Sequence, residues 1–143
     1  MILPDVNVLV IAHRADQEDH ERIRRWLSDE VNSDRPFALA DLAVAGFLRI
    51  VTNPRIYRRP SSLDTAISFV DGLMEQPTCV PVAAGPRHWP ILRRLLRDSD
   101  ARGNLVPDAH LAAIAVEHGA TVATRDRGFA RFPGLPWIDP VTG

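Results

Sequence analysis

Three aspartates occupy positions from which the edge of a parallel sheet would bring them together. Asp5 directly follows the first apolar run, and Asp126 comes shortly after the apolar run 120–124. Asp108 lies at the start of a helical pattern before that run, so its side chain can point toward the same edge. Because ligands of open parallel sheets bind outside the carboxyl ends of the strands, we expect the three aspartates to form one acidic pocket.

The acidic pocket predicts a metal-dependent chemistry. Carboxylates held close together repel one another, and a bound cation relieves that repulsion. Their hard oxygen ligands suit Mg²⁺, with Mn²⁺ as an alternative. Mg²⁺ keeps several waters and takes one or two carboxylates together with substrate phosphates, which matches hydrolysis of a phosphodiester. We therefore predict that Asp5, Asp108 and Asp126 are the metal ligands and catalytic residues of such an enzyme.

Each aspartate also has an ordinary structural explanation. Asp5 can cap a helix that begins at Val6. Asp108 lies beside Pro107 in a first helical turn, where the helix dipole favours an acid. Asp126 can be a turn residue. Their joint placement at one sheet edge is what favours the acidic pocket over these separate roles.

Short apolar runs alternate with amphipathic stretches along the chain, and this alternation predicts the fold. The spacing predicts helices over 20–31, 42–51, 62–75, 88–97 and 107–118, and strands over 2–3, 36–40, 78–82, 120–124 and 137–138. Strands separated by helices indicate a parallel sheet covered on both faces. We predict an α/β fold in which residues 1–143 form a single three-layer α/β/α domain around a central parallel sheet of four to five strands.

Caps and buried faces follow from the same pattern. Asp41 and Ser61 are expected to cap helices, and Gly119 to end one. Trp89 is expected in the core at a helix start, although a base-stacking role for His88 and Trp89 stays open. The histidines are otherwise expected at the surface or at helix ends. Four residues are expected on the buried face of the helix 62–75: Leu63, Ile67, Val70 and Met74.

Composition excludes several classes of mechanism and of location. All 17 basic residues are arginine, so no lysine can form a Schiff base or clamp a phosphate. The single cysteine, Cys79, can form no internal disulfide and is expected to be buried in a strand. The chain start lacks the basic segment of a signal peptide, and no apolar run approaches the ~18 residues of a membrane span. We therefore expect a cytoplasmic protein without membrane attachment.

Segments along nearly the whole chain resemble PIN domains and, more narrowly, the VapC toxins. Residues 3–9 (LPDVNVL), 103–112 (GNLVPDAHLA) and 123–129 (ATRDRGF) resemble the acidic motifs of the PIN family. Residues 46–54 and 85–89 resemble the corresponding regions of VapC toxins. Each motif alone is weak, but their order and spacing together are specific.

The VapC resemblance implies a Mg²⁺-dependent endoribonuclease that is the toxin of a toxin–antitoxin pair. Such proteins cleave RNA, often a structured RNA such as tRNA; they usually form homodimers and are silenced by a VapB antitoxin. By resemblance, Asp5 and Asp108 match the principal metal ligands, and Asp126 matches a further carboxylate of the pocket. Asn7 and Thr124 match polar residues that support the pocket.

The sequence departs from the family pattern at three places. PIN domains usually carry a glutamate where this chain has Gly46, and often a further acid where it has Gly128. Asp41 lies earlier on the same predicted helix and can approach the pocket, although capping is the simpler role. Pro4 stands in a strand that should be central, where it forfeits a ladder hydrogen bond. We therefore expect a leaner pocket than usual, with one metal ion rather than two.

Arginines are the candidates for contact with RNA. One cluster lies around the end of the helix 42–51 and another precedes the late acidic motif: Arg49, Arg55, Arg58 and Arg59, then Arg93, Arg94, Arg97 and Arg102. Of these, Arg49, Arg55 and Arg102 are the predicted RNA-binding residues. Phosphate contacts of this kind position a strand without reading its bases. A solvated helix face explains each cluster equally well.

Two other functions remain open. Without the usual glutamate, the pocket can be too weak to hold metal, which would leave a module that binds RNA or an antitoxin without cutting. A receiver domain or a haloacid-dehalogenase-type phosphatase also carries an aspartate after its first strand. Both normally need a lysine near the pocket, which this chain lacks, and the phosphatase needs an aspartate where this chain has Asn7.

Overall fold

The computed structural model describes all residues, 1–143, and its centre is one sheet of five parallel strands. The strands are β1 (Ile2–Pro4), β2 (Phe37–Ala40), β3 (Cys79–Val82), β4 (Thr121–Ala123) and β5 (Trp137–Ile138). Their order across the sheet is β3-β2-β1-β4-β5. The predicted parallel sheet of four to five strands is therefore confirmed.

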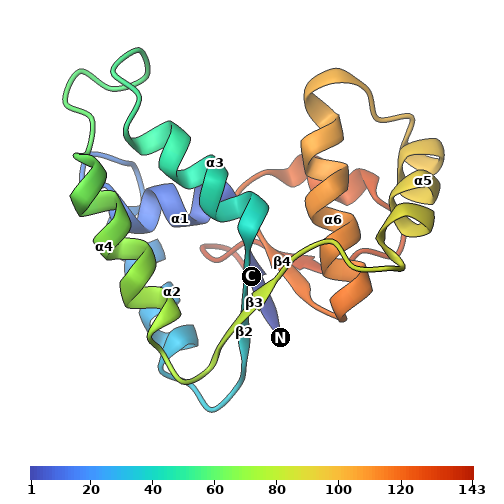
Figure 1. Ribbon diagram of the computed structural model, residues 1–143, viewed down its shortest axis with the longest axis horizontal. Helices are drawn as coiled ribbons and strands as arrows, with labels where there is room; N and C mark the ends of the chain where they lie inside the picture. Colours follow the sequence, from blue (N-terminus) through green and yellow to red (C-terminus); the bar gives the residue numbers. More distant parts are fainter.

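Six α-helices cover the sheet: α1 (Val6–His13), α2 (His20–Val31), α3 (Asp41–Val51), α4 (Leu63–Met74), α5 (His88–Ser99) and α6 (Val106–His118). Two short 3-10 helices, η1 (Gly103–Leu105) and η2 (Arg127–Arg131), follow α5 and β4. Helices α1 to α4 gather on one side of the strands, and α5 and α6 on the other (Figure 1). The predicted three-layer α/β/α fold is confirmed. None of these helices combines the length and the apolar character needed to cross a bilayer.

Strand β1 lies in the middle of the sheet, and this placement fixes the first aspartate. It pairs with β2 on one side and with β4 on the other, and Leu3 is fully buried between them. Pro4 has no N–H to donate. The next residue resumes the pairing, because the Asp5 N–H donates to the carbonyl oxygen of Ala123 at 2.9 Å. The ends of β1 and β4 are thus held side by side at one edge of the sheet.

Helix α6 runs through the interior of its layer, and this placement fixes the second aspartate. Ala109 and the residues 111–115 are buried, and α5 packs against this helix. Pro107 lies in the first turn and Gly119, with a φ of 66°, ends the helix, as predicted. Asp108 therefore lies in the first turn of a helix that is firmly packed.

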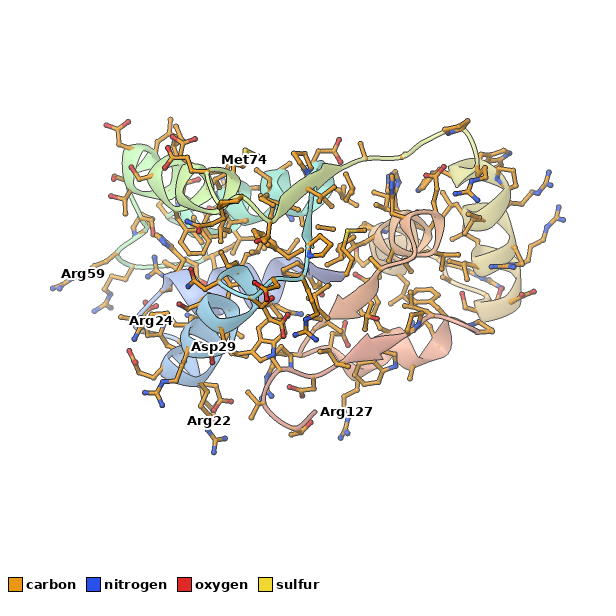
Figure 2. The ribbon with its side chains drawn as sticks, turned by 90° about the horizontal axis from the view of Figure 1, so that it is seen from below. Arg22, Arg24, Asp29, Arg59, Met74 and Arg127 are labelled. Atoms are coloured by element: carbon orange, nitrogen blue, oxygen red, sulfur yellow. The ribbon has the colours of Figure 1, made fainter.

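The predicted buried face of α4 is wrong at three of its four positions. Val70 is buried, but Leu63, Ile67 and Met74 are 60%, 41% and 46% exposed. Figure 2 shows Met74 on the outside of the molecule. The buried face of the helix is instead the one that carries Ala66, Val70 and Leu73. Ala66 is fully buried on this face and α4 packs against α3, so the larger apolar residues lie on the outside.

Three further expectations differ from the structure. Trp89 is exposed, and its neighbour His88 is buried instead, with its ring 4.4 Å from that of His110 on α6. Cys79 is only half-buried, because β3 is an edge strand. Ser62 rather than Ser61 caps α4, accepting from the Thr65 N–H at 3.1 Å.

The carboxylate of Glu117 supports the loop that enters α5. Its two oxygens accept from the backbone N–H groups of Gly85 at 2.7 Å and Arg87 at 2.9 Å. Burial acts to raise the pKa of Glu117, but these N–H groups and the nearby His118 and His88 outweigh it, so the pKa lies below its ordinary value. The stabilisation is therefore present above the ordinary pKa of 4.5 and is lost as the pH falls through the lower folded value.

A Glu117→Gln variant is expected to be less stable at neutral pH. The glutamine side chain has only one oxygen, so its NH₂ group would face a backbone N–H that has lost its acceptor. Urea unfolding midpoints of both proteins should differ at pH about 7 and converge in acid. Glu75→Gln is the matched control, since Glu75 is exposed and its carboxylate makes no hydrogen bond or ion pair. An equal loss of stability at every pH would contradict this account of Glu117.

Candidate metal centre

A cavity of about 580 Å³ is lined by all three predicted aspartates, Asp5, Asp108 and Asp126. They come from three separate places: the junction of β1 and α1, the first turn of α6, and the junction of β4 and η2. The cavity therefore lies at the edge where β1 and β4 end, as the sequence predicted. We call it the acidic cavity.

Asp5 is buried, and both of its carboxylate oxygens are engaged. Oδ1 accepts from the Val6 N–H at 2.7 Å, which caps α1, and Oδ2 accepts from Thr124 Oγ1 at 2.8 Å and Asn7 Nδ2 at 3.0 Å. Burial raises the pKa of Asp5 above its ordinary value, against the bonds from Thr124 and Val6, and the charge of Asp126 adds to the rise. Capping and a place in the pocket thus coexist, since Oδ1 keeps an unused lone pair.

Thr124 and Asn7 join the end of β1 to the loop after β4. The buried Thr124 hydroxyl donates to Asp5 and accepts from Asn7 Nδ2 at 3.1 Å and from the Asp126 N–H at 3.0 Å. Asn7 Oδ1 in turn accepts from the Arg125 N–H at 3.1 Å. Every polar group in this network has a partner, so the two aspartates are held in a fixed relation.

Asp126 is exposed and its carboxylate also holds its own loop. Oδ1 accepts from the Gly128 N–H at 2.8 Å and so caps η2. A Cβ at position 128 would lie 2.9 Å from Asp126 Oδ1 and 2.9 Å from Arg131 Nη2. The glycine at the place of the family's further acid therefore leaves room for Asp126 to fold back.

Asp108 carries the clearest electrostatic signature of the acidic cavity. Burial is the largest cause that raises its pKa to about 6, and the negative charges of Asp5 and Asp126 raise it as well. Arg131 acts in the opposite direction. The three carboxylates are thus close enough to disfavour one another's ionisation, which a divalent cation would relieve.

The donor set of the acidic cavity fits a hard divalent cation. No three histidine, cysteine, aspartate or glutamate side chains of the protein form a ready-made metal-ligand group. Mg²⁺ does not require one, because it binds through one or two carboxylates and completes its shell with waters and substrate phosphates. Carboxylates without a soft ligand also exclude a structural zinc site of the usual kind.

The position of the missing glutamate, Gly46, lines the acidic cavity, whereas Asp41 does not. Asp41 is exposed at the first residue of α3, where its Oδ1 accepts from the Leu42 N–H at 2.7 Å. The structure therefore assigns Asp41 to the helix start, and it does not replace the glutamate.

Gly46 is kept small by Val6, since a Cβ at position 46 would lie 2.8 Å from Val6 Cγ2. We expect Gly46→Ala to destabilise the protein, because overpacking costs about 1–3 kcal/mol and exceeds the helix preference of about 1 kcal/mol for alanine. In a Val6→Ala background the same change should be neutral or stabilising. Urea unfolding of the four proteins measures this coupling, and an identical effect of Gly46→Ala in both backgrounds would contradict it.

The predicted RNA-binding arginines lie in different surroundings. Arg49 lines the acidic cavity, and its guanidinium makes no ion pair or hydrogen bond within the chain. Arg55 is exposed in the turn after α3, whereas Arg102 lies outside the cavity lining and pairs with Asp100 at 3.0 Å. Figure 2 shows Arg59 pointing away from the molecule at the end of the same loop. The RNA-binding role of these residues stays a prediction.

Two residues of this region, Arg131 and Tyr57, were not among the predicted site residues. Arg131 lowers the pKa of Asp108 and donates through Nε to the Gly128 carbonyl oxygen at 2.7 Å. Tyr57 lines the acidic cavity from the loop between α3 and α4. No local pattern marks either one, because each comes near the aspartates only through the folded path of the chain. None of the five histidines lines the cavity.

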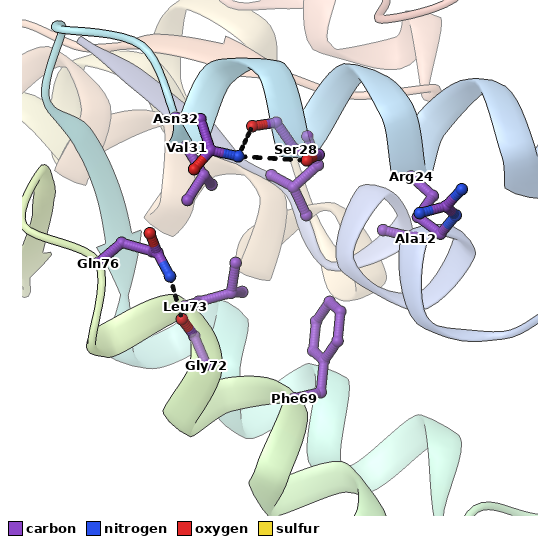
Figure 3. A pocket seen from close by; sticks show the side chains of 10 residues that line it. Ala12, Arg24, Ser28, Val31, Asn32, Phe69, Gly72, Leu73 and Gln76 are labelled. Atoms are coloured by element: carbon purple, nitrogen blue, oxygen red, sulfur yellow. Dashed lines mark hydrogen bonds between the residues drawn. The ribbon is translucent and has the colours of Figure 1, made fainter.

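A second cavity, of about 230 Å³, lies between α2 and α4. Val31 faces Phe69 and Leu73 across it, and the side-chain amide of Gln76 donates to the Gly72 carbonyl oxygen (Figure 3). No carboxylate lines this cavity. It is therefore not a candidate metal centre.

Comparison with known proteins places the whole chain in one family. Residues 2–135 match the PIN domain family. The chain is 47% identical over 143 residues to the VapC ribonuclease Mb2897 of Mycobacterium bovis, covering 100% of this chain and 97% of that protein. It is 46% identical over 140 residues to ribonuclease VapC25 of Mycobacterium tuberculosis, covering 98% of this chain and 99% of that protein.

Solved structures with low sequence identity share the fold. VapBC2 from Rickettsia felis, bound to a promoter DNA fragment, matches with a TM-score of 0.71 at 17% identity, covering 96% of this chain and 98% of that chain. VapC20 of Mycobacterium tuberculosis, a sarcin-ricin loop cleaving toxin, matches with a TM-score of 0.69 at 12% identity, covering 91% and 93%. The sequence match over nearly the full chain, the two close relatives and this fold together show that the chain belongs to the VapC ribonucleases of the PIN-domain family.

Proposed function

We propose that the protein is a Mg²⁺-dependent endoribonuclease whose active site is the acidic cavity, with Mn²⁺ able to replace Mg²⁺. The observation that carries the proposal is the convergence of Asp5, Asp108 and Asp126 on one cavity, with the pKa of Asp108 raised by burial and by the other two. Membership of the VapC ribonucleases supports the reaction class.

Different residues of the protein have different roles in the proposed hydrolysis. Asp5 and Asp108, helped by Asp126, would hold the metal, which when bound supplies an activated water and offsets charge on the phosphate. Thr124 and Asn7 keep the Asp5 carboxylate in place. Attack of water on phosphorus in line with the departing 3′ oxygen leaves a 5′-phosphate on one product and a 3′-hydroxyl on the other.

Two guanidinium groups near the three aspartates would receive the RNA backbone. Arg49 lines the acidic cavity without an internal partner, and Arg131 lies close enough to Asp108 to lower the pKa of that carboxyl. Guanidinium groups bind phosphate through planar, paired hydrogen bonds. They would position the strand without reading its sequence.

We further propose that the protein is the toxin of a VapBC pair, that it forms a homodimer, and that its target is a structured RNA such as tRNA. The fold is shared with solved VapBC assemblies from Rickettsia felis and Salmonella typhimurium, which supports a VapB-type antitoxin as partner. Light scattering of the purified chain with and without its antitoxin tests the assembly. A monomer that binds no VapB-type protein would contradict this part.

The reaction is tested by incubating the purified protein with end-labelled RNAs, including tRNA, in Mg²⁺ and in EDTA. Cleavage is expected only with the metal, and sequencing of the products should show 5′-phosphate ends. Cleavage that survives EDTA, or ends that carry a 2′,3′-cyclic phosphate, would contradict the mechanism.

A weak or inactive RNA-binding module is the second candidate. The observation in its favour is Gly46, whose position leaves no acid on that side of the cavity, while Asp41 lies elsewhere. Binding of RNA in Mg²⁺ without any cleavage would favour this alternative.

A further inference from the structure

Tyr57 is the only tyrosine of the chain, and its ring forms part of the wall of the acidic cavity. It lies on the loop between α3 and α4, far along the chain from the three aspartates that line the same cavity. The ring is half-buried, and its hydroxyl group has no hydrogen-bond partner within the protein. The lining of the acidic cavity therefore combines an aromatic residue with charged and amide side chains.

The ring of Tyr57 is backed by a buried arginine. The Arg14 Cζ atom lies 3.7 Å from the ring centroid, within the range of a cation–π contact. Arg14 is only 8% exposed and is itself fixed by Asp16, by Ser61 Oγ at 3.3 Å and by the Arg59 carbonyl oxygen at 3.1 Å. One side of the ring is thus occupied by protein.

The loop around Tyr57 is also held by its own backbone. The Tyr57 N–H donates to the Asn53 carbonyl oxygen at 3.1 Å, and the Ser61 N–H donates to the Val51 carbonyl oxygen at 2.8 Å. A ring fixed in this way loses little conformational freedom when a flat ligand stacks on it. The loop that carries Tyr57 is therefore ordered before any ligand binds.

We propose that Tyr57 binds the RNA substrate by stacking on a base beside the cleaved phosphodiester, and that Arg14 is the positioning residue that holds the ring. The inference rests on the proposed ribonuclease function and extends it to the recognition of an unpaired nucleotide. Loops of structured RNA offer such splayed bases, and aromatic rings bind them with little preference for sequence. Arg49 on the same cavity wall would hold the adjoining phosphate.

Steady-state cleavage of a short RNA with one cleavage site separates binding from chemistry. Tyr57→Leu is expected to raise KM by about 5- to 150-fold, the range that loss of one base–aromatic stack produces, with little change in kcat. Tyr57→Phe and Tyr57→Trp keep the stack and should stay near the wild-type KM. Urea unfolding of each variant shows whether the fold is intact.

A second measurement reports stacking in the bound state without any cleavage. RNAs with 2-aminopurine at single positions around the cleavage site are bound to the wild-type protein in EDTA. One position next to that site should lose fluorescence through stacking, and Tyr57→Leu should restore it. If no position is quenched by the wild-type protein, or if Tyr57→Leu leaves both KM and quenching unchanged, the inference is overturned. Failure of the wild-type protein to cleave in Mg²⁺ while quenching persists would instead overturn the ribonuclease function alone.

Discussion

An Asp108→Asn variant is expected to lose at least about a hundredfold in RNA cleavage, while its metal-free form becomes more stable than the wild type. Residues that only support metal ligands typically contribute 10- to 100-fold to activity, so a proposed ligand should lie at or beyond that range. The amide keeps the size of the side chain and removes its charge. Cleavage at saturating Mg²⁺ measures the effect, with Asp41→Asn as a control because Asp41 lies outside the acidic cavity.

The gain in stability follows from the raised pKa of Asp108. Burial, with the charges of Asp5 and Asp126, raises that pKa from 3.8 to about 6, so the ionised carboxylate opposes folding at neutral pH. Because the group is partly open to solvent, we expect a gain of about 1 kcal/mol rather than the full value of the shift. The gain should be complete above pH about 6 and vanish below the ordinary pKa of 3.8, where both chains carry a neutral group.

Urea unfolding in EDTA across this pH range tests the second half of the prediction. Equal stability of Asp108→Asn and the wild type at neutral pH would show that the carboxylates do not strain the folded state. A loss of both stability and activity would mean that Asp108 acts in folding rather than in the reaction.

Thr124→Val is expected to have the second largest effect, although Thr124 contacts no proposed substrate. Valine has nearly the same shape, but it leaves the Asp126 N–H without an acceptor and removes the hydroxyl that donates to Asp5. Loss of these buried partners should lower the stability by about 1–3 kcal/mol. Cleavage should fall by about 10- to 100-fold, because the Asp5 carboxylate loses the group that orients it.

Thr124→Ser separates the hydroxyl from the methyl group of the side chain. Serine keeps all three hydrogen bonds and loses one buried methyl, so the expected loss of stability is about 1 kcal/mol with cleavage near the wild-type rate. Urea unfolding and kcat of both variants are the measurements. If serine impairs cleavage as much as valine does, the hydrogen-bond network around Asp5 is not what matters.

The fold was predictable because the local patterns agree with the global arrangement. The apolar run before Asp5, the helix start at Pro107 and the glycine at 119 each mark a real boundary. The regular alternation of helices and strands then indicated a parallel sheet. Because sites in such sheets lie at the carboxyl ends of the strands, Asp5 and Asp108 were expected in one cavity, where the structure has them. The resemblance to PIN domains pointed to the same residues.

The remaining features depend on packing that no local pattern reports. Leu63, Ile67 and Met74 have helical spacing, yet they are exposed, and α4 buries the face that carries Ala66 instead. Val6, which lies on a neighbouring helix, leaves no room for a side chain at position 46. The backing of one aromatic ring by a buried guanidinium requires two loops to meet in space. In the last two cases the deciding partner is distant in sequence.

Calorimetric titration of Mn²⁺ into the wild type, Asp108→Asn and Asp41→Asn tests whether the acidic cavity binds a metal ion. Competition by Mg²⁺ shows whether Mg²⁺ binds at the same place. We predict that the wild type and Asp41→Asn each bind one ion per chain and that Asp108→Asn binds it at least about tenfold more weakly. Equal binding by all three proteins, or no binding by the wild type even with RNA present, would contradict a metal centre at the acidic cavity.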